Sequence, residues 1–469
     1  MSIHISRASL KGLLIWVILA MPGYIHSQNQ RFTPEQIRED IDFMFTKMEE
    51  VHPNLYYFMP EESVQNEKEK LLADITAPID RIELCKAFKP LVSRLNDGHT
   101  SLRWPQQEIM RYVQMGGKFF PAAVYIDDNQ LFVKASQDDI LAPDARILEI
   151  NNIPVVDIIK EMRKYISGEK TMYKDTRIAY RFSTYYWFLF QKGSRFKVRF
   201  QSGNEEPQSV NLKGLNAYEV DQLSTGSSTK KQNFEYRQLD ERTSLIEFRS
   251  FSGREKFKEF LENSFKQIKE TEIRNLIIDI RENGGGNSSL GDDLFNYITS
   301  KPYTQVDAML VKLSDDVLND GWGNWLNKDT LEHYRGKVFT SPAYLKDPGS
   351  NKLRFKGDVY LLTGPRSFSS ANMFASTFKC YEIGTIVGEE TGGLTVSYGD
   401  VRNYLLPNTQ IHFGCSFKQF YEACGKQDWK GVLPDYEVKS IPSTSSDPVL
   451  DYTLDLIDKK QSTSYRKQK

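Results

Sequence analysis

The stretch NLIIDIRENGGGNSSLGDDLFNYITS, residues 275–300, decides the fold class of this chain. A nearly all-apolar strand pattern comes first, three consecutive glycines follow it, and a helix pattern closes the stretch. The stretch DVYLLTGPRSFSSANMFASTFK, residues 358–379, repeats this order of strand, turn and helix. Apolar strands that alternate with helices indicate a buried, mostly parallel sheet, so we expect an α/β fold for this part of the chain.

Composition and periodicity divide the rest of the chain into further units. The length of 469 residues suggests about three domains. Thr33 and Pro34 have the residue types of a helix cap and a first helical residue, and short strand patterns follow after residue 115. We predict a signal peptide at 1–27, an N-terminal helical domain at 31–110, an α+β module at 115–215, a polar linker at 216–234, an α/β domain at 235–457 and a disordered tail at 458–469.

The first 27 residues have the order of a secretory signal peptide. Arg7 and Lys11 precede the apolar run Leu13–Met21, and the small Ser27 offers a cleavage point. A membrane anchor is the alternative, but this run is shorter than the roughly 20 residues that a spanning helix needs. We therefore expect an exported protein, periplasmic or extracellular, without stable membrane insertion after cleavage.

The charge balance bears on the possible partners of the chain, and the cysteines and histidines bear on possible metal sites and disulfides. Lys and Arg number 61 against 62 Asp and Glu, so the charge gives no reason to expect a nucleic acid partner. No CxxC, HExxH or His/Cys cluster occurs, and we expect neither a metal nor another cofactor. In an exported protein Cys415 and Cys424 are close enough for a hairpin disulfide, whereas Cys85 and Cys380 are expected as buried thiols.

The glycine loop Asp279–Ser289 follows one buried strand and precedes a helix. Glycines let a backbone approach a ligand and direct its N–H groups inward, which suits a phosphate or an oxyanion, although a plain tight turn is the alternative. A P-loop needs Lys and Ser or Thr after the glycines, and here Asn287 follows Gly286. The oxyanion interpretation is therefore favoured over the phosphate one.

The serine loop Gly364–Ser376 places Ser367, Ser369 and Ser370 at the start of a second helix. One serine suffices as an N-cap, so the others are candidates for a nucleophile beside the unpaired N–H groups of the first turn. A nucleophilic serine needs a base. His99, in a turn rich in Asn, Asp and Gly, is the best candidate, and His52 is its rival.

Five segments carry a family resemblance when they are taken together and in order. They are LNDGHTSL (95–102), LIIDIRENGGGNSS (276–289), VYLLTGPRSFSSANMF (359–374), IGTIVGEETGG (383–393) and GVLPDYEV (431–438). They resemble the tail-specific, or carboxy-terminal processing, serine peptidases and their tricorn-type relatives. The resemblance implies a crotonase-like (ClpP/crotonase) α/β catalytic core at 235–457, a PDZ-like module at 115–215, and hydrolysis of peptide bonds in a peptide or protein substrate.

The resemblance also implies roles for individual residues. It places the nucleophile at Ser369, with Ser370 as a rival because Asn372 replaces the family's usual Glu in that motif. Leu394 stands where the Ser-Lys branch carries its lysine, so the chain looks closer to the tricorn-type Ser-His branch. His99 is then the base.

In that branch a carboxylate three residues before Gly431 orients the histidine, and Asp428 occupies this position. The expected oxyanion donors are the N–H groups of Gly285 and Ser370, and the reaction would pass through an acyl-enzyme. The alternative is an inactive family member that binds peptides or lipids, and a third interpretation is an acyl-CoA enzyme on the same core. The oligomeric state and the recognition of carboxyl termini by the PDZ-like module stay open.

Overall fold

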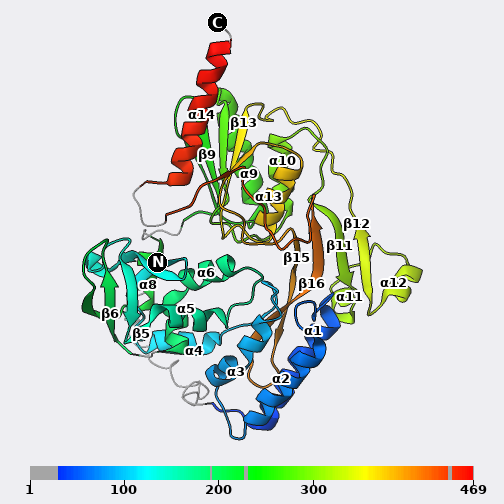
Figure 1. Cartoon of the computed structure of the whole chain (residues 1–469). Coiled ribbons are helices and arrows are strands. Elements are labelled where there is room, and N and C mark those ends of the chain that lie inside the picture. The colour runs from blue at the N-terminus through cyan, green and yellow to red at the C-terminus, as the bar shows by residue number, and fades with distance from the viewer. Residues whose placement is uncertain (1–29, 191–192, 226–230, 442–445, 468–469) are drawn as a thin grey trace, which may run out of the picture.

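The computed structural model describes residues 30–190, 193–225, 231–441 and 446–467 (Figure 1). The predicted signal peptide lies outside the described residues. Over the ranges that the structure does describe, no helix is long and apolar enough to cross a membrane.

A mostly parallel sheet forms the centre of the α/β domain. Its strand order is β17-β14-β13-β10-β9-β8, and every neighbouring pair is parallel except β8 with β9. Its strands are β8 (Phe234–Gln238), β9 (Thr243–Phe248), β10 (Asn275–Asp279), β13 (Asp358–Thr363), β14 (Thr385–Gly388) and β17 (Tyr436–Glu437). The predicted parallel pairing is confirmed.

Both faces of this sheet are covered by helices, which explains its nearly all-apolar strands. Ile278 and Leu361 face a core shared with α9 (Arg254–Glu270), α10 (Ser289–Ile298) and α13 (Ser370–Cys380). Ile277 and Leu362 face the other side and pack against α14 (Pro448–Lys467). Helix α14 includes most of the segment that the sequence predicts as a disordered tail.

A second sheet is antiparallel and was not predicted. Its order is β1-β16-β11-β12, and β15 also pairs with β16. Its strands are β1 (Ser101–Leu102), β11 (Val306–Lys312), β12 (Val338–Pro342), β15 (Val396–Leu405) and β16 (His412–Glu422). The short helices α11 (Asp315–Asn319) and α12 (Lys328–Tyr334) lie between β11 and β12 in the chain.

The antiparallel sheet packs against the first and third of four N-terminal helices. The four helices are α1 (Pro34–Val51), α2 (Glu61–Asp74), α3 (Arg81–Ser93) and α4 (Gln106–Gln114). Thr33 caps α1 and Pro34 is its first residue, as the sequence predicts. Met44 of α1 shares one core with Phe413 of β16, which lies 369 residues later in the chain, so the helical region is continuous with this sheet.

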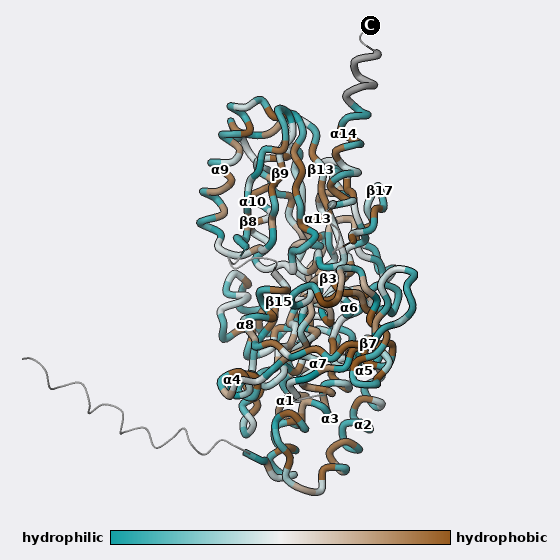
Figure 2. Tube along the Cα trace, turned by 90° about the vertical axis from the view of Figure 1, so that its left-hand side faces the viewer, coloured by the Kyte–Doolittle hydropathy of each residue, from teal (hydrophilic) through white to brown (hydrophobic). Residues whose placement is uncertain are grey.

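The α+β module has a sheet of its own, with the order β2-β3-β4-β6-β7 and β5 paired with β4. Its elements are β2 (Ala122–Asp127), β3 (Gln130–Ser136), the 3₁₀ turn Gln137–Asp139, β4 (Arg146–Ile150), β5 (Ile153–Pro154), α5 (Val155–Arg163), α6 (Thr171–Tyr180), α7 (Phe182–Leu189), β6 (Arg195–Gln201) and β7 (Gln208–Lys213). Helix α8 (Ala217–Thr225) begins inside the predicted linker. In Figure 2 the module lies between the parallel sheet at one end of the molecule and α1–α3 at the other.

The disulfide pairing differs from the prediction. Cys380, at the end of α13, is bonded to Cys424, just after β16, while Cys85 and Cys415 are free and buried. Cys415 points into the core under β16 beside α1, because alternate residues of a strand face opposite sides. The bond therefore joins the parallel-sheet layer to the antiparallel sheet.

Candidate active site

The glycine loop and the serine loop meet at the carboxyl edge of the parallel sheet. Strands β10 and β13 are parallel neighbours, with Asp279 opposite Leu362, so the loops that follow them emerge side by side. Gly285 has φ +96°, and a Cβ added there would lie 2.7 Å from both the Phe368 carbonyl oxygen and Ser369 Cβ. Only glycine allows this approach.

The three candidate serines have different surroundings. Ser367 Oγ donates to the Ile280 carbonyl at 2.8 Å, and Ser370 Oγ donates to the Gly286 carbonyl at 2.6 Å, so both fasten the two loops together. Ser369 has φ 56° and ψ −125°, a region that non-glycine residues rarely adopt. This conformation sits at a sharp turn between strand and helix, as in nucleophile elbows.

The structure brings His99 to Ser369. His99 Nε2 lies 3.0 Å from Ser369 Oγ, although the two residues are 270 positions apart. The imidazole stacks on Phe368 with a ring-centroid distance of 4.8 Å. Burial lowers the pKa of His99 below its ordinary value, while the Asp97 carboxylate acts in the opposite direction.

Asp97, which the sequence analysis did not single out, lies behind His99. Its Oδ1 accepts the His99 backbone N–H at 2.8 Å and lies 3.9 Å from His99 Nδ1. Nδ1 itself has no hydrogen-bond partner among the residues that the structure describes.

A buried network holds the other oxygen of Asp97. Oδ2 accepts from Ser416 Oγ at 2.6 Å and from Thr100 Oγ1, and it lies 3.3 Å from His52 Nε2. His52 Nδ1 accepts the Asn54 N–H at 3.1 Å, so a neutral His52 carries its proton on Nε2 and donates it to Asp97. Burial opposes ionisation of Asp97, but the hydrogen bonds from His52 and Ser416 hold its pKa below the ordinary value.

The structure does not bring Asp428 to His99. Asp428 is exposed on the loop after β16, and its Oδ1 accepts the Lys430 N–H at 3.2 Å. Over the described part of the chain, no ion pair joins it to a histidine. Asp97, rather than Asp428, lies beside the His99 imidazole.

The predicted oxyanion donors also differ from each other. Ser370 is the first residue of α13, and its N–H belongs to the turn whose donors lack helical partners. The N–H of Gly285 donates to Asn283 Oδ1 at 2.9 Å, so this group is already bonded although it lies beside Ser369. Ser370 thus fits its predicted place better than Gly285 does.

Asn372 and Leu394, the two departures from the family pattern, have structural contacts. The Asn372 amide donates to the Leu394 carbonyl at 3.0 Å and to Glu422 Oε2 at 2.7 Å. Burial raises the pKa of Glu422 to about 8. Asn372 therefore fastens α13 to the start of β15 and the end of β16.

No group of three or more His, Cys, Asp and Glu side chains is placed to hold a metal ion within the described ranges. Of the residues that the sequence analysis missed, Asp97 stands two positions before His99 and could have been examined for that reason. Ser416 carried no such signal, because it lies 319 positions from Asp97 and reaches it through the pairing of β1 with β16.

Comparisons with known proteins give one family match and several similar solved structures. Residues 242–438 match the model of peptidase family S41. Mature CPAF is similar over 86% of this chain and 92% of its own, with 12% identity and a TM-score of 0.62. A mutant of CPAF covers 86% and 93%, with 13% identity and a TM-score of 0.64. The photosystem II D1 C-terminal processing protease covers 87% and 94%, with 12% identity and a TM-score of 0.49.

A search of curated proteins found no match. At 12–13% identity the likeness to CPAF shows the fold alone. The α/β layer, the N-terminal helices and the additional antiparallel sheets belong to that shared fold.

Proposed function

We propose that this chain hydrolyses peptide bonds with Ser369 as nucleophile and His99 as general base, because residues 242–438 match the model of peptidase family S41, a family of serine-type proteases. The observation that carries the proposal is the 3.0 Å distance between His99 Nε2 and Ser369 Oγ. This separation lies within hydrogen-bond reach of a proton transfer. We also propose the crotonase-like core and the PDZ-like module that the resemblance implies. Of the two branches we propose the Ser-His branch, because Leu394 offers no base.

In the proposed first step His99 Nε2 takes the proton of Ser369 Oγ while Oγ attacks the scissile carbonyl carbon. His99 must then carry its other proton on Nδ1, which faces Asp97 Oδ1 at 3.9 Å. The ionised Asp97 stabilises the imidazolium that forms. His99 next gives its proton to the leaving amine, and a water molecule hydrolyses the acyl-enzyme by the reverse sequence of proton transfers.

We assign the oxyanion site to the N–H groups of Ser370 and Gly286. Phe251 N–H donates to the Gly285 carbonyl, Asn287 N–H donates to the Phe251 carbonyl, and Phe251 forms a parallel bridge with Gly286. In such a bridge Gly286 turns both its N–H and its C=O away from Phe251. Its carbonyl accepts from Ser370 Oγ, so its N–H faces the serine loop as well.

We also propose that the protein works outside the cytoplasm. The disulfide between Cys380 and Cys424 supports this, because such bonds persist in oxidising compartments. The signal-peptide pattern at residues 1–27 is consistent with it.

The first test is labelling with a fluorophosphonate probe, with the modified residue mapped by mass spectrometry. Wild type should be labelled at Ser369, and the Ser369→Ala and His99→Ala variants should not be labelled. Ser370→Ala is the matched control, because its hydroxyl bonds the Gly286 carbonyl and should not be the site of attack. Labelling at Ser370, or none in a folded wild type, would contradict the assignment and favour a binding role.

The second test is hydrolysis of a peptide library by the same variants. Products from wild type and none from Ser369→Ala would support peptide-bond hydrolysis. Labelling of Ser369 without any peptide cleavage would instead point to a serine hydrolase of another specificity.

A further inference from the structure

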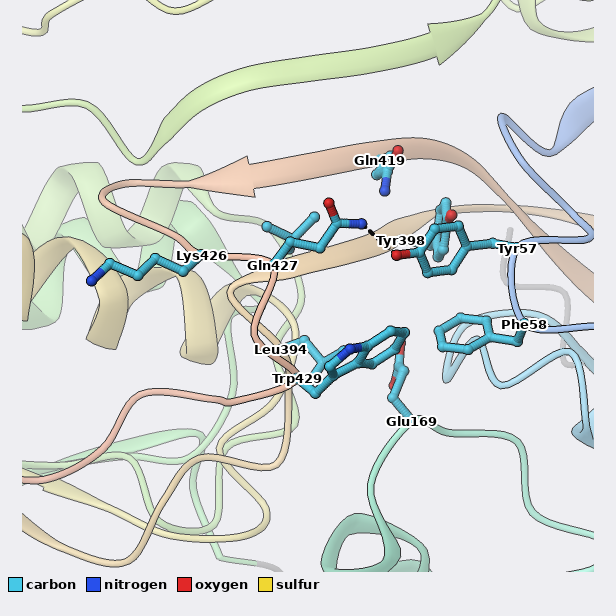
Figure 3. Close-up of a pocket in the computed structure, with 10 residues that line it drawn as sticks. Tyr57, Phe58, Glu169, Leu394, Tyr398, Gln419, Lys426, Gln427 and Trp429 are labelled. Atoms are coloured by element: carbon cyan, nitrogen blue, oxygen red, sulfur yellow. Dashed lines mark hydrogen bonds between the residues drawn. The ribbon is translucent and has the colours of Figure 1, made fainter.

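A cleft opens beside the proposed catalytic pair, and the proposed mechanism does not involve it. The empty space between its lining residues is about 340 Å³, and most of this space is open solvent rather than enclosed cavity. Aromatic rings form much of its lining, as Figure 3 shows. Its lining residues are Tyr57, Phe58, Glu169, Leu394, Val396, Tyr398, Gln419, Lys426, Gln427 and Trp429.

The cleft lies next to the turn that carries His99. A Cβ added to Gly98 would lie 3.4 Å from Glu169 Oε2. On the strand β15 side, a Cβ added to Gly399, which follows Tyr398, would lie 3.9 Å from His99 Cε1. A side chain in the cleft would therefore belong to a substrate residue close to the bond that is cut.

Two buried polar atoms line the cleft without a partner. Glu169 Oε2 and the Tyr398 hydroxyl make no hydrogen bond to any residue in the described ranges. Tyr398 is only 4% exposed. Burial and the charge of Asp97 raise the pKa of Glu169 to about 8, and the backbone N–H groups of Glu169 and Gly98 and the charge of Lys174 offset this only in part. Buried polar atoms without a partner cost free energy until a donor meets them.

The lysines near Glu169 bond to other groups and do not donate to Glu169 Oε2. Lys170 forms an ion pair with Glu390 and donates to the Thr391 carbonyl at 3.1 Å. Lys174 donates to Asn96 Oδ1 at 3.3 Å. Figure 3 shows the ammonium group of Lys426 pointing away from the aromatic rings.

The aromatic rings complete a site for a cation. Trp429 is 52% exposed and Tyr57 is 39% exposed, and the two rings stack with a centroid distance of 5.9 Å. Phe58 packs against Trp429 at 5.2 Å, and the Gln427 amide donates to the Tyr57 hydroxyl at 2.6 Å. These contacts hold the rings in place, and exposed aromatic faces attract cations.

We propose that this cleft binds the Lys or Arg side chain of a peptide substrate. The proposal rests on the proposed function, because it assigns a specificity to that same site. The apolar stem of the side chain would lie along the rings of Tyr57 and Trp429, and its charged head would donate to Glu169 and Tyr398. An apolar side chain would leave both polar atoms unpaired, and an acidic one would approach the negative charge of Asp97.

The decisive experiment compares peptides that differ in one residue, Arg against citrulline and Lys against norleucine. These pairs change the charge and keep the shape nearly constant. Wild type should prefer the charged member of each pair by about tenfold or more in kcat/KM, the gain expected from a cation held by a carboxylate and aromatic rings. In Glu169→Gln the ratio should fall close to one, and in Trp429→Ala it should fall in part.

Glu161→Gln is the matched control, because this carboxylate lies in the same module, pairs with Lys164 and does not line the cleft. It should keep the wild-type ratio. Equal cleavage of both members by wild type, or an unchanged ratio in Glu169→Gln, would overturn the proposal. Because each ratio is taken within one variant, it does not depend on the fraction of active protein.

A binding measurement separates this proposal from the proposed function. Benzamidine should bind the Ser369→Ala protein more tightly than the uncharged benzamide, and Glu169→Gln should remove the difference. Binding without fluorophosphonate labelling of wild type would retain the cation site and reject the peptidase mechanism. Labelling with equal affinity for the two compounds would do the reverse.

Discussion

The two members of the proposed catalytic pair are held in different ways. Ser369 stands between a parallel strand and its own helix, and its neighbours Ser367 and Ser370 bond to loops of the same sheet. His99 stands in a turn after α3, and Asp97 connects that turn to Ser416 on strand β16. The nucleophile is positioned by local backbone geometry, whereas the base depends on contacts between distant parts of the chain.

This difference predicts how a substitution on each side affects activity and stability. On the Ser369 side, a substitution should remove chemistry and leave the fold, because strain at one residue is supported by a sheet that packs independently of it. On the His99 side, a substitution should affect chemistry and stability together, because the same buried carboxylate serves both.

The largest expected effect is that of Ser369→Ala. Loss of the nucleophile should lower kcat by about 10⁴-fold or more, as in other serine peptidases. The free energy of unfolding, measured by urea titration, should stay near that of wild type. A large loss of stability would show that the two sides are not separable in this way.

The next largest effect is expected for Asp97→Asn. It should lower kcat by about 10³- to 10⁴-fold, because the imidazolium loses its counter-charge and His99 its preferred tautomer. It should also reduce stability by about 1–3 kcal/mol, because the Asp97 hydrogen bonds are disturbed in a buried place.

Asp428→Asn is the matched variant for Asp97→Asn. An exposed carboxylate that bonds a neighbouring backbone N–H should change kcat by less than about twofold. Steady-state kinetics on one peptide compares the pair directly. A greater loss in Asp428→Asn than in Asp97→Asn would restore the role that the family resemblance gave to Asp428.

A smaller effect concerns the pH dependence of kcat/KM. His99 acts as a base only when neutral, so activity should fall as the pH drops through its pKa, which burial lowers. The acid limb should therefore lie below the range of an ordinary histidine. Asp97 and Asp400 raise this pKa and Arg177 lowers it, so Asp97→Asn should move the limb to still lower pH.

Glu169 does not disturb this measurement. Its pKa of about 8 places its titration on the alkaline side, away from the acid limb. A limb above the ordinary histidine range in wild type, or one that rises in Asp97→Asn, would contradict the assignment of His99 as the base.

The smallest effect on activity is expected for the disulfide. Replacing Cys380 and Cys424 by serine should lower the free energy of unfolding by about 2–4 kcal/mol, because the bond closes a long loop. The value of kcat at 25 °C should change by less than about twofold. Thermal unfolding and kinetics of the same preparation test this, and a collapse of kcat would show that the bond positions His99 or Ser369 directly.

The two sides also differ in how far the sequence predicts them. Strands β10 and β13 are short apolar runs followed by glycine or serine loops, so their parallel pairing and the meeting of these loops follow from local patterns. The pairing of Ser369 with His99 came from a family resemblance, and the structure brings these two residues together.

The antiparallel sheet could not be predicted in the same way. Strands β15 and β16 show no regular alternation of buried and exposed residues, and β16 pairs with β1 more than 300 positions earlier. Asp97 and Ser416 meet only through that pairing. Spacing in a motif suggested Asp428, which the structure leaves exposed on the loop after β16, and spacing likewise suggested the wrong partner for Cys424.

The long separation between His99 and Ser369 in the sequence has a consequence for the synthesis and folding of the protein. The base is made early in synthesis, the nucleophile 270 residues later, and Ser416, which holds Asp97, later still. Contacts between such distant residues form late in folding, because the loop between them must first be closed. A full-length but partly folded copy therefore carries both side chains of the proposed pair but lacks the contact between them that the proposed mechanism needs.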